Sequence, residues 1–391
     1  MKSFGMWYQT NEESSNNKTL EKSCEFLTHN NSSDAKPEFD LHVNFWSMED
    51  IKTDKNIKNP YLDIGIKISD YKLLKQLTFY CPFKIEPNGI KDLSGIVSQK
   101  SNANIIFNDD CEIETKDNYT IVQLSNLERL LVFPIFAAIK DVCKVEERKE
   151  TNGSEIRFDF EKFHNYVGEV EKLKDLNTLY IRFRINNVNL RNHIYFDSEP
   201  LNKSFESAFS GTRIIDFKVN EKRNIPDSVR TEIIVRKEEW AIFKNIHFLA
   251  MMPSSYDLTP LCEERMTCRE LEPEIWDDYL DAKIDFTQGH VLAYHWRKKS
   301  SDERNFIEDF SCLVKVNYSK TKIITIIAYA LSVIALGIVS GIIHEFIDII
   351  FNARSDSTDV MIIKIAIESI TVVVLIFVAI VLGKVKLGKR K

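Results

Sequence analysis

Glycine is scarce in this chain, with 12 among 391 residues, about 3% against the roughly 7% that is usual in proteins. The sequence has neither the Gly-x-x-x-x-Gly-Lys-Ser/Thr loop that cradles nucleotide phosphates nor the Gly-x-Ser-x-Gly turn that presents a nucleophilic serine. These two glycine-dependent sites are therefore excluded. A basic excess is also lacking, because 52 lysines and arginines stand against 58 aspartates and glutamates and leave a formal net charge of −6. This balance disfavours nucleic acid as a partner bound through bulk charge.

Paired cysteine spacings are absent as well. The chain has seven cysteines, an odd number, and none belongs to a Cys-x-x-Cys pair, which argues against a zinc ribbon and a disulfide framework. His290 and His295 are five residues apart and would face opposite sides of a strand. We therefore predict buried, reduced thiols, structural histidines and no metal site. Because no local pattern pairs a nucleophile with a base, the sequence indicates neither catalytic residues nor a cofactor.

Two long apolar runs dominate the C-terminal part of the sequence. The run 323–343 has no charged residue and would rise about 30 Å as a helix, the thickness of a bilayer's hydrocarbon core. A second run, 360–383, is also long enough to span, although it contains Lys364 and Glu368. Because hydrocarbon offers no partners to backbone amides, both runs are predicted to be helices. Residues 320–391 are thus expected to form a two-helix transmembrane hairpin with a basic tail.

The charges beside these runs predict how the hairpin crosses the membrane. Basic residues flank the runs on their outer sides, whereas the connector 344–359 holds one arginine and four acidic residues. Since basic flanks stay on the cytoplasmic side, both termini are predicted to face the cytoplasm. The opening residues become polar too soon for the apolar core of a signal peptide, which favours the same placement. The sequence predicts a multi-pass protein of the cell (inner) membrane, with the lipid bilayer as a partner.

Segments in which apolar and polar residues alternate fill the region before the membrane runs. This period of two predicts strands with one buried face at residues 39–45, 62–68, 77–83, 156–160, 179–185, 215–219 and 312–316. Asn152-Gly153 predicts a hairpin turn. A capping-box pattern at Ser125–Glu128 predicts a helix that continues toward Ile139, and the apolar spacing from Phe160 to Leu173 predicts another.

These patterns predict an α+β fold, in which a β-rich cytoplasmic region precedes the membrane hairpin. The charged stretch 144–152 separates two groups of strands, so we expect two sandwich-like units in series. The expected divisions are a loosely ordered N-terminal segment (1–38), a β-rich unit (39–145), a second β-rich unit with a few helices (146–319), and the hairpin (320–391) with spans 323–343 and 360–383.

A basic cluster stands out in the acidic body, just after the strand predicted at 215–219. Its members are Lys218, Lys222, Arg223, Arg230 and Arg236. Ammonium and guanidinium groups at this density could bind a phosphate or another anionic small molecule. The alternative is a solvated segment whose charges pair with neighbouring glutamates such as Glu221 and Glu232. The sequence leaves both alternatives open.

The membrane runs hold two further patterns. Gly337 and Gly341 share one helical face and would allow another helix to approach closely, unless the span simply tolerates small residues there. Lys364 and Glu368 share a face of the second run, where charges usually meet a partner or water. They could form a local ion pair or a polar seam between several copies. Because two helices cannot enclose a pore alone, a channel would require a homo-oligomer.

The layout of a soluble domain followed by a two-helix hairpin is similar to that of membrane-acting effectors of bacterial immunity, whose soluble part senses a signal and whose hairpin disrupts the envelope. The likeness is one of layout and carries no residue-level match. Our first hypothesis is a non-enzymatic, membrane-anchored sensor or effector in antiviral defence. It would receive an anionic small-molecule or protein signal, self-associate, and form a channel or perturb the membrane. The alternatives are a membrane-tethered enzyme with dispersed catalytic residues, and a scaffold or accessory subunit of another membrane protein.

Overall fold

The computed structural model describes most of the chain. The described residues are 2–11, 36–86, 88–116, 118–136, 142–168, 170–187, 189–198, 210–262, 264–272, 275–301, 305–319 and 323–351, with helical residues 365, 366, 369, 370, 372–374, 376 and 377. They divide into a larger unit, within 1–196 and 213–316, and a smaller unit, within 197–212 and 317–391.

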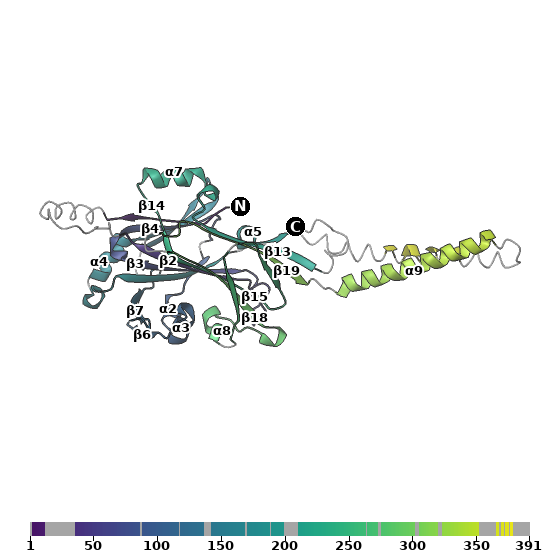
Figure 1. The fold of residues 1–391 in the computed structure, drawn as a ribbon, viewed down its shortest axis with the longest axis horizontal. Coiled ribbons are helices and arrows are strands. Elements are labelled where there is room, and N and C mark those ends of the chain that lie inside the picture. Colours follow the sequence, from purple (N-terminus) through teal and green to yellow (C-terminus); the bar gives the residue numbers. More distant parts are fainter. Residues whose placement is uncertain are drawn as a thin grey trace. The chain divides into compact units, whose positions relative to one another are not determined.

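The described strands form three sheets (Figure 1). The five-stranded sheet has the order β14 (Glu239–Trp240), β1 (Gly5–Thr10), β4 (Leu74–Cys81), β10 (Gly153–Asp159) and β9 (Cys143–Arg148). The ten-stranded sheet runs β17 (Met266–Glu270), β18 (Val291–Lys299), β15 (Phe243–Pro253), β2 (Glu38–Trp46), β3 (Tyr61–Ser69), β11 (Thr178–Asn186), β8 (Arg129–Val132), β7 (Thr120–Gln123) and β6 (Glu112–Thr115), with β5 (Ile90–Asp92) on β11. The four-stranded sheet has the order β12 (Tyr195–Ser198), β13 (Ser210–Val219), β19 (Phe310–Ser319) and β16 (Asp257–Pro260).

The core lies between the five-stranded and ten-stranded sheets. Alternate residues of β2, from Phe39 to Phe45, are fully buried, and the same holds for the apolar positions of β3 and β11. Phe183 of β11 lies 6.0 Å from Phe79 of β4 and 6.2 Å from Phe158 of β10, ring centroid to centroid. The predicted alternation therefore works as expected, because each strand turns one apolar face toward the other sheet.

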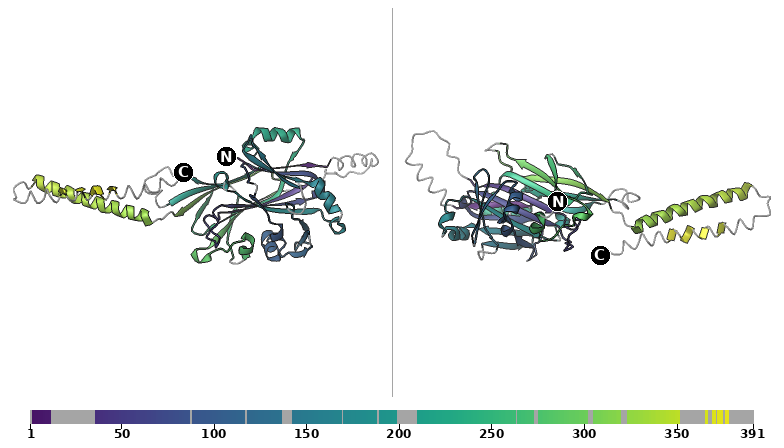
Figure 2. Two further views of the ribbon diagram at one scale, coloured as in Figure 1. Left: turned by 180° about the vertical axis from the view of Figure 1, so that it is seen from behind. Right: turned by 90° about the horizontal axis from the view of Figure 1, so that it is seen from below.

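Short helices lie around this sandwich, some over its outer faces and others with residues buried in the core. Their bounds are α2 (Ser94–Val97), α3 (Lys100–Phe107), α4 (Phe160–Gly168), α5 (Leu190–His193), α7 (Asp227–Val235), α8 (Ile275–Leu280) and the 3₁₀ turns η1 (Tyr71–Leu73), η2 (Glu171–Leu173), η3 (Lys222–Asn224) and η4 (Phe286–Gln288). In Figures 1 and 2, α7 lies on the side of the five-stranded sheet, and α2, α3 and α8 lie on the opposite side, beside the ten-stranded sheet.

The β-rich character and the predicted strands are confirmed. The predicted segments became β2, β3, β4, β10, β11, β13 and β19. The hairpin predicted at Asn152-Gly153 joins β9 to β10, and Asn152 has a positive φ of 54°. Val145 and Ile156 lie directly opposite each other across that hairpin.

Three sequence-based expectations for the larger unit need correction. The N-terminal segment 1–38 is not loosely ordered throughout, because residues 5–10 form β1, with Trp7 buried between β4 and β14; residues 12–35 lie outside the described residues. Strands from both sides of residue 145 pair with each other, β4 with β10 and β3 with β11, so two units in series do not describe the pairing. The helix expected after Ser125 is replaced by β8, which pairs with β7 and β11.

The first apolar run forms α9 (Ile323–Phe351), which is longer than the predicted span 323–343. Among the described residues it is the one helix long and apolar enough to cross a membrane. Only nine residues of the second run, between 365 and 377, are described, all of them helical, so the two-helix hairpin is not confirmed. Ala335 of α9 and Val372 of the second run are both buried within the smaller unit.

Candidate functional site

The predicted basic cluster is distributed over β13, η3, α7 and the residue after α7, and each member has a carboxylate partner. Lys218 lies 3.6 Å from Asp216, Lys222 lies 3.3 Å from Glu308, Arg223 lies 2.8 Å from Glu221, Arg236 lies 3.3 Å from Glu232, and Arg230 pairs with Asp227. These pairs match the solvated alternative considered for the sequence. Anion binding at this segment stays a prediction.

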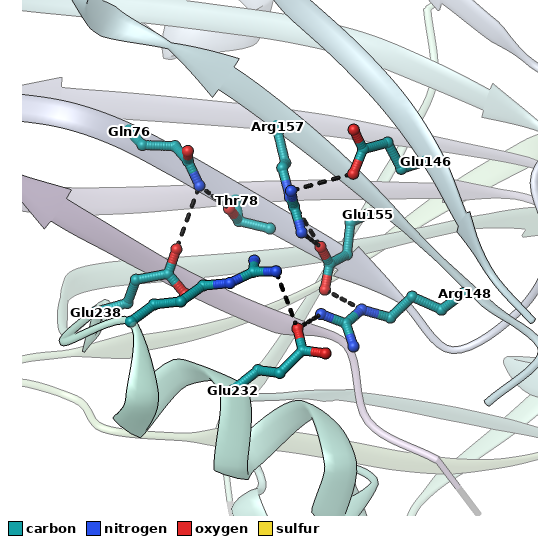
Figure 3. A network of polar contacts seen from close by, with 9 residues as sticks. Gln76, Thr78, Glu146, Arg148, Glu155, Arg157, Glu232 and Glu238 are labelled. Atoms are coloured by element: carbon teal, nitrogen blue, oxygen red, sulfur yellow. Dashed lines mark hydrogen bonds and ion pairs between the residues drawn. The ribbon is translucent and has the colours of Figure 1, made fainter. Parts of the chain in front are cut away.

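The end of α7 joins a charged network on the outer face of the five-stranded sheet (Figure 3). The carboxylate of Glu155 on β10 is fully buried and accepts hydrogen bonds from Arg148 and, at 2.5 Å, from Arg157. Arg148 also pairs with Glu232 of α7, and this contact lowers the pKa of Glu232. Gln76, Glu146 and Glu238 extend the network. Its charges are nearly balanced, so we interpret it as the attachment of α7 to the sheet.

The outer face of the ten-stranded sheet carries a second polar group that is far more buried. We call Asp63, Tyr180, Arg182, Arg184 and Tyr279 the buried cluster, because each is at most 3% exposed. The first four come from neighbouring strands β3 and β11, and Tyr279 reaches them from α8. The alternation of both strands that fills the core on one side directs these polar residues to the other side.

Asp63 is the centre of the buried cluster. Its carboxylate accepts hydrogen bonds from Arg184 Nε at 2.6 Å and Nη2 at 3.0 Å, from Tyr279 Oη at 2.7 Å and from Trp46 Nε1 at 3.1 Å. Burial by itself lowers the pKa of Arg184, but the adjacent Asp63 carboxylate more than offsets this and the pKa is raised. Arg184 is therefore charged and held in a bidentate pair.

Arg182 is the second buried cation of the cluster, and hydroxyl groups separate it from the Asp63 carboxylate. Its Nη2 donates to Tyr279 Oη at 2.7 Å and its Nη1 donates to Tyr180 Oη at 2.8 Å, so its nearest partners in the cluster are hydroxyls. Gly65 on β3 makes room for it, because a Cβ there would lie 2.2 Å from Tyr180 Oη and 2.9 Å from Arg182 Nη1. The cluster holds two guanidinium groups and one carboxylate, an excess of one positive charge.

Three histidines continue the polar face across the strands. Tyr180 Oη lies 3.3 Å from His42 Nδ1, the rings of His42 and His247 lie 5.1 Å apart, and His247 Nδ1 lies 3.0 Å from His295 Nε2. Burial lowers the pKa of all three, that of His247 to about 4. Because the imidazoles are neutral, one nitrogen of each ring can accept a hydrogen bond. The row therefore combines two hydrogen bonds with an edge-to-face ring contact between His42 and His247, and it adds no charge to the face.

A cavity of about 240 Å³ lies at the end of the same face, where β2 and β15 begin. It is lined by Glu38, Phe39, Asp40, Lys67, Ser69, Glu128, Lys244 and Asn245. Asp40 and Lys67 stand two residues along their strands from His42 and Gly65, and burial raises the pKa of Asp40. Lys67 pairs with Glu128 at 2.7 Å and lies 3.8 Å from Asp40. Asn245 Nδ2 also donates to Asp40 at 2.9 Å, so the charged and polar groups that line the cavity bond to one another.

No cation site accompanies this cavity in the described part of the chain. Among the residues that the structure describes, no group of three or more His, Cys, Asp or Glu side chains could hold a metal ion. The sequence did not single out the buried cluster, the histidine row or the cavity. In the sequence these residues appear as the polar positions of the alternating strands. That alternation does not show whether other elements will cover the polar face.

The membrane residues fall partly outside the described chain. Gly337 and Gly341 lie in α9 and are exposed, and a Cβ on Gly337 would have no neighbour within 4 Å outside the helix's own backbone. Lys364 and Glu368 lie outside the described residues. Their ion pair or polar seam stays a prediction.

Comparison with known proteins identifies no family. No protein family model matches the chain, and no curated protein sequence matches it. Any function must therefore be argued from its own residues.

Proposed function

We propose that this chain is a membrane-anchored sensor whose β-sandwich receives a small polar signal and whose C-terminal helix holds the protein in the bilayer. The observation that carries the proposal is α9, a helix of 29 residues that would be about 43 Å long. Its large side chains stay exposed on several sides, among them Val333, Ile334, Leu336 and Phe346. An apolar surface of this size is stable in lipid and costly in water.

The cavity at the polar face supports the receiving half of the proposal. Its walls carry Asp40, Lys67 and Asn245 close together, and a polar ligand could replace the contacts that these groups make with one another. Sites for small ligands combine a concave shape with a few placed polar groups in this way. The ligand class is small and polar, with charge complementary to both a carboxylate and an ammonium group.

The glycine face of α9 supports self-association, with a second copy of this chain as the partner. Ala335 is buried, whereas Gly337, two residues later, is exposed. Two residues correspond to a turn of about 200° around a helix, so the glycine face points away from the buried side. Gly341 extends this face by one turn and is exposed as well. Closely packed helices in membranes use such small residues.

Alkaline carbonate extraction tests the anchor. The full chain is expected to stay in the membrane pellet, and a variant ending at Ser319 is expected to appear in the supernatant. Release of the full chain would overturn the proposal, because peripheral proteins are the ones that carbonate removes. Protease protection of tags at each end would then test whether both termini face the cytoplasm.

Crosslinking in membranes tests self-association. Gly337→Ile with Gly341→Ile should reduce the crosslinked dimer, because two branched side chains would keep the helices apart. Leu336→Ala, which changes side-chain volume about 100° away around the helix, is the matched control and should leave the dimer in place. Equal crosslinking in all three proteins would contradict the glycine interface.

Dye leakage tests the effector part of the proposal. Cells that express the full chain should lose membrane integrity when the signal is present, and cells that express the variant ending at Ser319 should not. Glu368→Leu should reduce leakage if a polar seam conducts. Intact membranes in every case would reject the channel while leaving the anchor and the sensor standing.

A further inference from the structure

Two cysteines that are 50 residues apart in the sequence lie side by side at β19, the last strand before α9. Cys312 lies on β19 and is fully buried, and Cys262 lies two residues after β16 and is partly buried. Their Sγ atoms are 3.8 Å apart. Among the cysteines that the structure describes, Cys262 and Cys312 are the pair whose sulfur atoms lie in contact.

The backbone places these two residues opposite each other. Leu261 N–H donates to the Leu313 carbonyl at 2.9 Å, and one residue further along each segment, in opposite directions, Cys262 meets Cys312. Directly opposite residues on neighbouring antiparallel segments have Cα atoms about 4.5 to 5.5 Å apart, which falls within the range that disulfides span. Rotation about χ1 can bring the sulfurs to the bond length of about 2.05 Å without moving the strands.

We infer that Cys262 and Cys312 are a reversible disulfide site that a peroxide closes and a dithiol reopens. This inference does not depend on the ligand or on the channel. The sequence predicted reduced thiols in a cytoplasmic compartment, and a site of this kind is reduced there until an oxidant appears. Nothing in the sequence indicated this pair, because the fold brings the two cysteines together and their separation along the chain matches no motif.

The chemistry requires one molecule of peroxide for each disulfide. The Cys262 sulfur, as its thiolate, attacks one peroxide oxygen, the O–O bond breaks, and the leaving hydroxide takes up a proton to become water. Cys262 is then a sulfenic acid. The Cys312 sulfur attacks the Cys262 sulfur, the S–O bond breaks, and the hydroxyl leaves as water with the proton that Cys312 gives up. Two thiols are oxidised and one peroxide is reduced to two waters.

Exposure assigns the two roles. Cys262 is the more accessible thiol and meets the oxidant first, whereas Cys312 lies in the core and acts second. Burial raises the pKa of the Cys312 thiol, so it reacts slowly with peroxide on its own. The product ties the segment after β16 to β19, the strand that precedes α9 in sequence.

Peptide mapping of the full chain in detergent tests the inference. The protein is reduced with a dithiol, desalted, exposed to hydrogen peroxide, alkylated and digested with trypsin without reduction. The sequence separates the cysteines conveniently, because Cys262 falls in peptide 245–265, Cys268 in 266–269 and Cys312 in 305–315. We expect 245–265 linked to 305–315 as the main disulfide product, and its loss after a second treatment with dithiol.

Two variants provide controls. Cys268→Ser removes an exposed thiol that is not part of the pair and should leave the linked product unchanged. Cys262→Ser should abolish the product and leave Cys312 as a thiol. The inference is overturned if 245–265 links to 266–269 instead, or if Cys312 is recovered as a thiol under peroxide conditions that oxidise Cys268.

Discussion

Replacing Asp63 by asparagine tests the central claim that one carboxylate holds the outer face of the ten-stranded sheet together. Asp63 is fully buried and accepts four hydrogen bonds from Arg184, Tyr279 and Trp46. The amide of asparagine keeps the size of the side chain but removes the charge and presents N–H groups where only acceptors fit. Two buried guanidinium groups would then lack any carboxylate within the cluster.

The expected cost is large because removing one partner of a buried ion pair leaves an uncompensated charge. Such changes typically cost about 3 to 5 kcal/mol in the free energy of unfolding. Urea titration of the detergent-solubilised chain, followed by tryptophan fluorescence, should report this loss, since Trp46 donates directly to Asp63. Asp281→Asn is the matched control, because Asp281 is 68% exposed in its pair with Lys55 and its replacement should cost far less than that of Asp63.

A double variant sharpens the test. Arg184→Met together with Asp63→Asn removes both partners, so its cost should be smaller than the sum of the two single changes by about 0.5 to 3 kcal/mol. If Asp63→Asn costs no more than the Asp281→Asn control, or if the two single costs simply add, the buried cluster does not stabilise the fold in the way described.

Other substitutions on this face test its packing and its charge. Tyr279→Phe removes the hydroxyl that links the Arg182 guanidinium to the Asp63 carboxylate and should lower the free energy of unfolding by about 1 to 3 kcal/mol. Tyr71→Phe is the control, because it removes a buried hydroxyl with no hydrogen-bond partner among the described residues and should cost nothing. Equal shifts of the two midpoints in thermal unfolding would contradict the link through Tyr279. Gly65→Ala places a carbon 2.2 Å from the Tyr180 hydroxyl oxygen and should destabilise the fold by about 1 to 3 kcal/mol. Gly95→Ala is the control, because its added carbon would have no neighbour within 4 Å. Similar urea midpoints for the two variants would refute the close approach at Gly65. Burial lowers the pKa of His247 to about 4, so between about pH 6.5 and pH 4 the unfolded chain binds a proton that the folded chain does not. Stability should therefore fall by about 3 kcal/mol as the pH drops through this window, and His247→Gln should flatten that part of the profile; parallel profiles would show that this histidine does not titrate as argued.

The sequence predicted the strands well because their signal is local. In β2 the apolar residues Phe39, Leu41, Val43 and Phe45, and in β3 Leu62, Ile64, Ile66 and Ile68, stand at the positions that the period of two requires, and both strands formed with these faces buried. The hairpin at Asn152-Gly153 is equally local, since a left-handed residue at the turn is all that it needs.

Features that depend on distant partners were not predictable from such patterns. β1 was counted with the polar N-terminal segment. It could not be predicted locally, because its neighbours in the sheet come from residues 74–81 and 239–240. The pattern at Ser125–Glu128 resembles a helix start, yet Leu127 has a positive φ of 67° and the next residues pair with β7 and β11. Tertiary pairing overrides the local preference there.

The candidate site was missed for a related reason. The polar positions of the strands, such as Arg182 and His42, indicated a face turned to water, and alternation cannot show that other elements will cover it. Phe107 of α3 contacts His42 and Tyr180, and Tyr279 of α8 completes the buried cluster. Only the fold brings these segments together.

The position of β1 between β4 and β14 has a consequence for synthesis of the protein. A ribosome adds about 5 to 20 residues per second, so a strand at residues 5–10 waits roughly 10 to 50 s before residue 240 exists to complete its pairing. During that interval its Met-Trp-Tyr segment needs shielding from other nascent chains. The apolar helix α9 follows β19 and is synthesised late. Two apolar segments therefore need protection from water, β1 early in translation and α9 near its end.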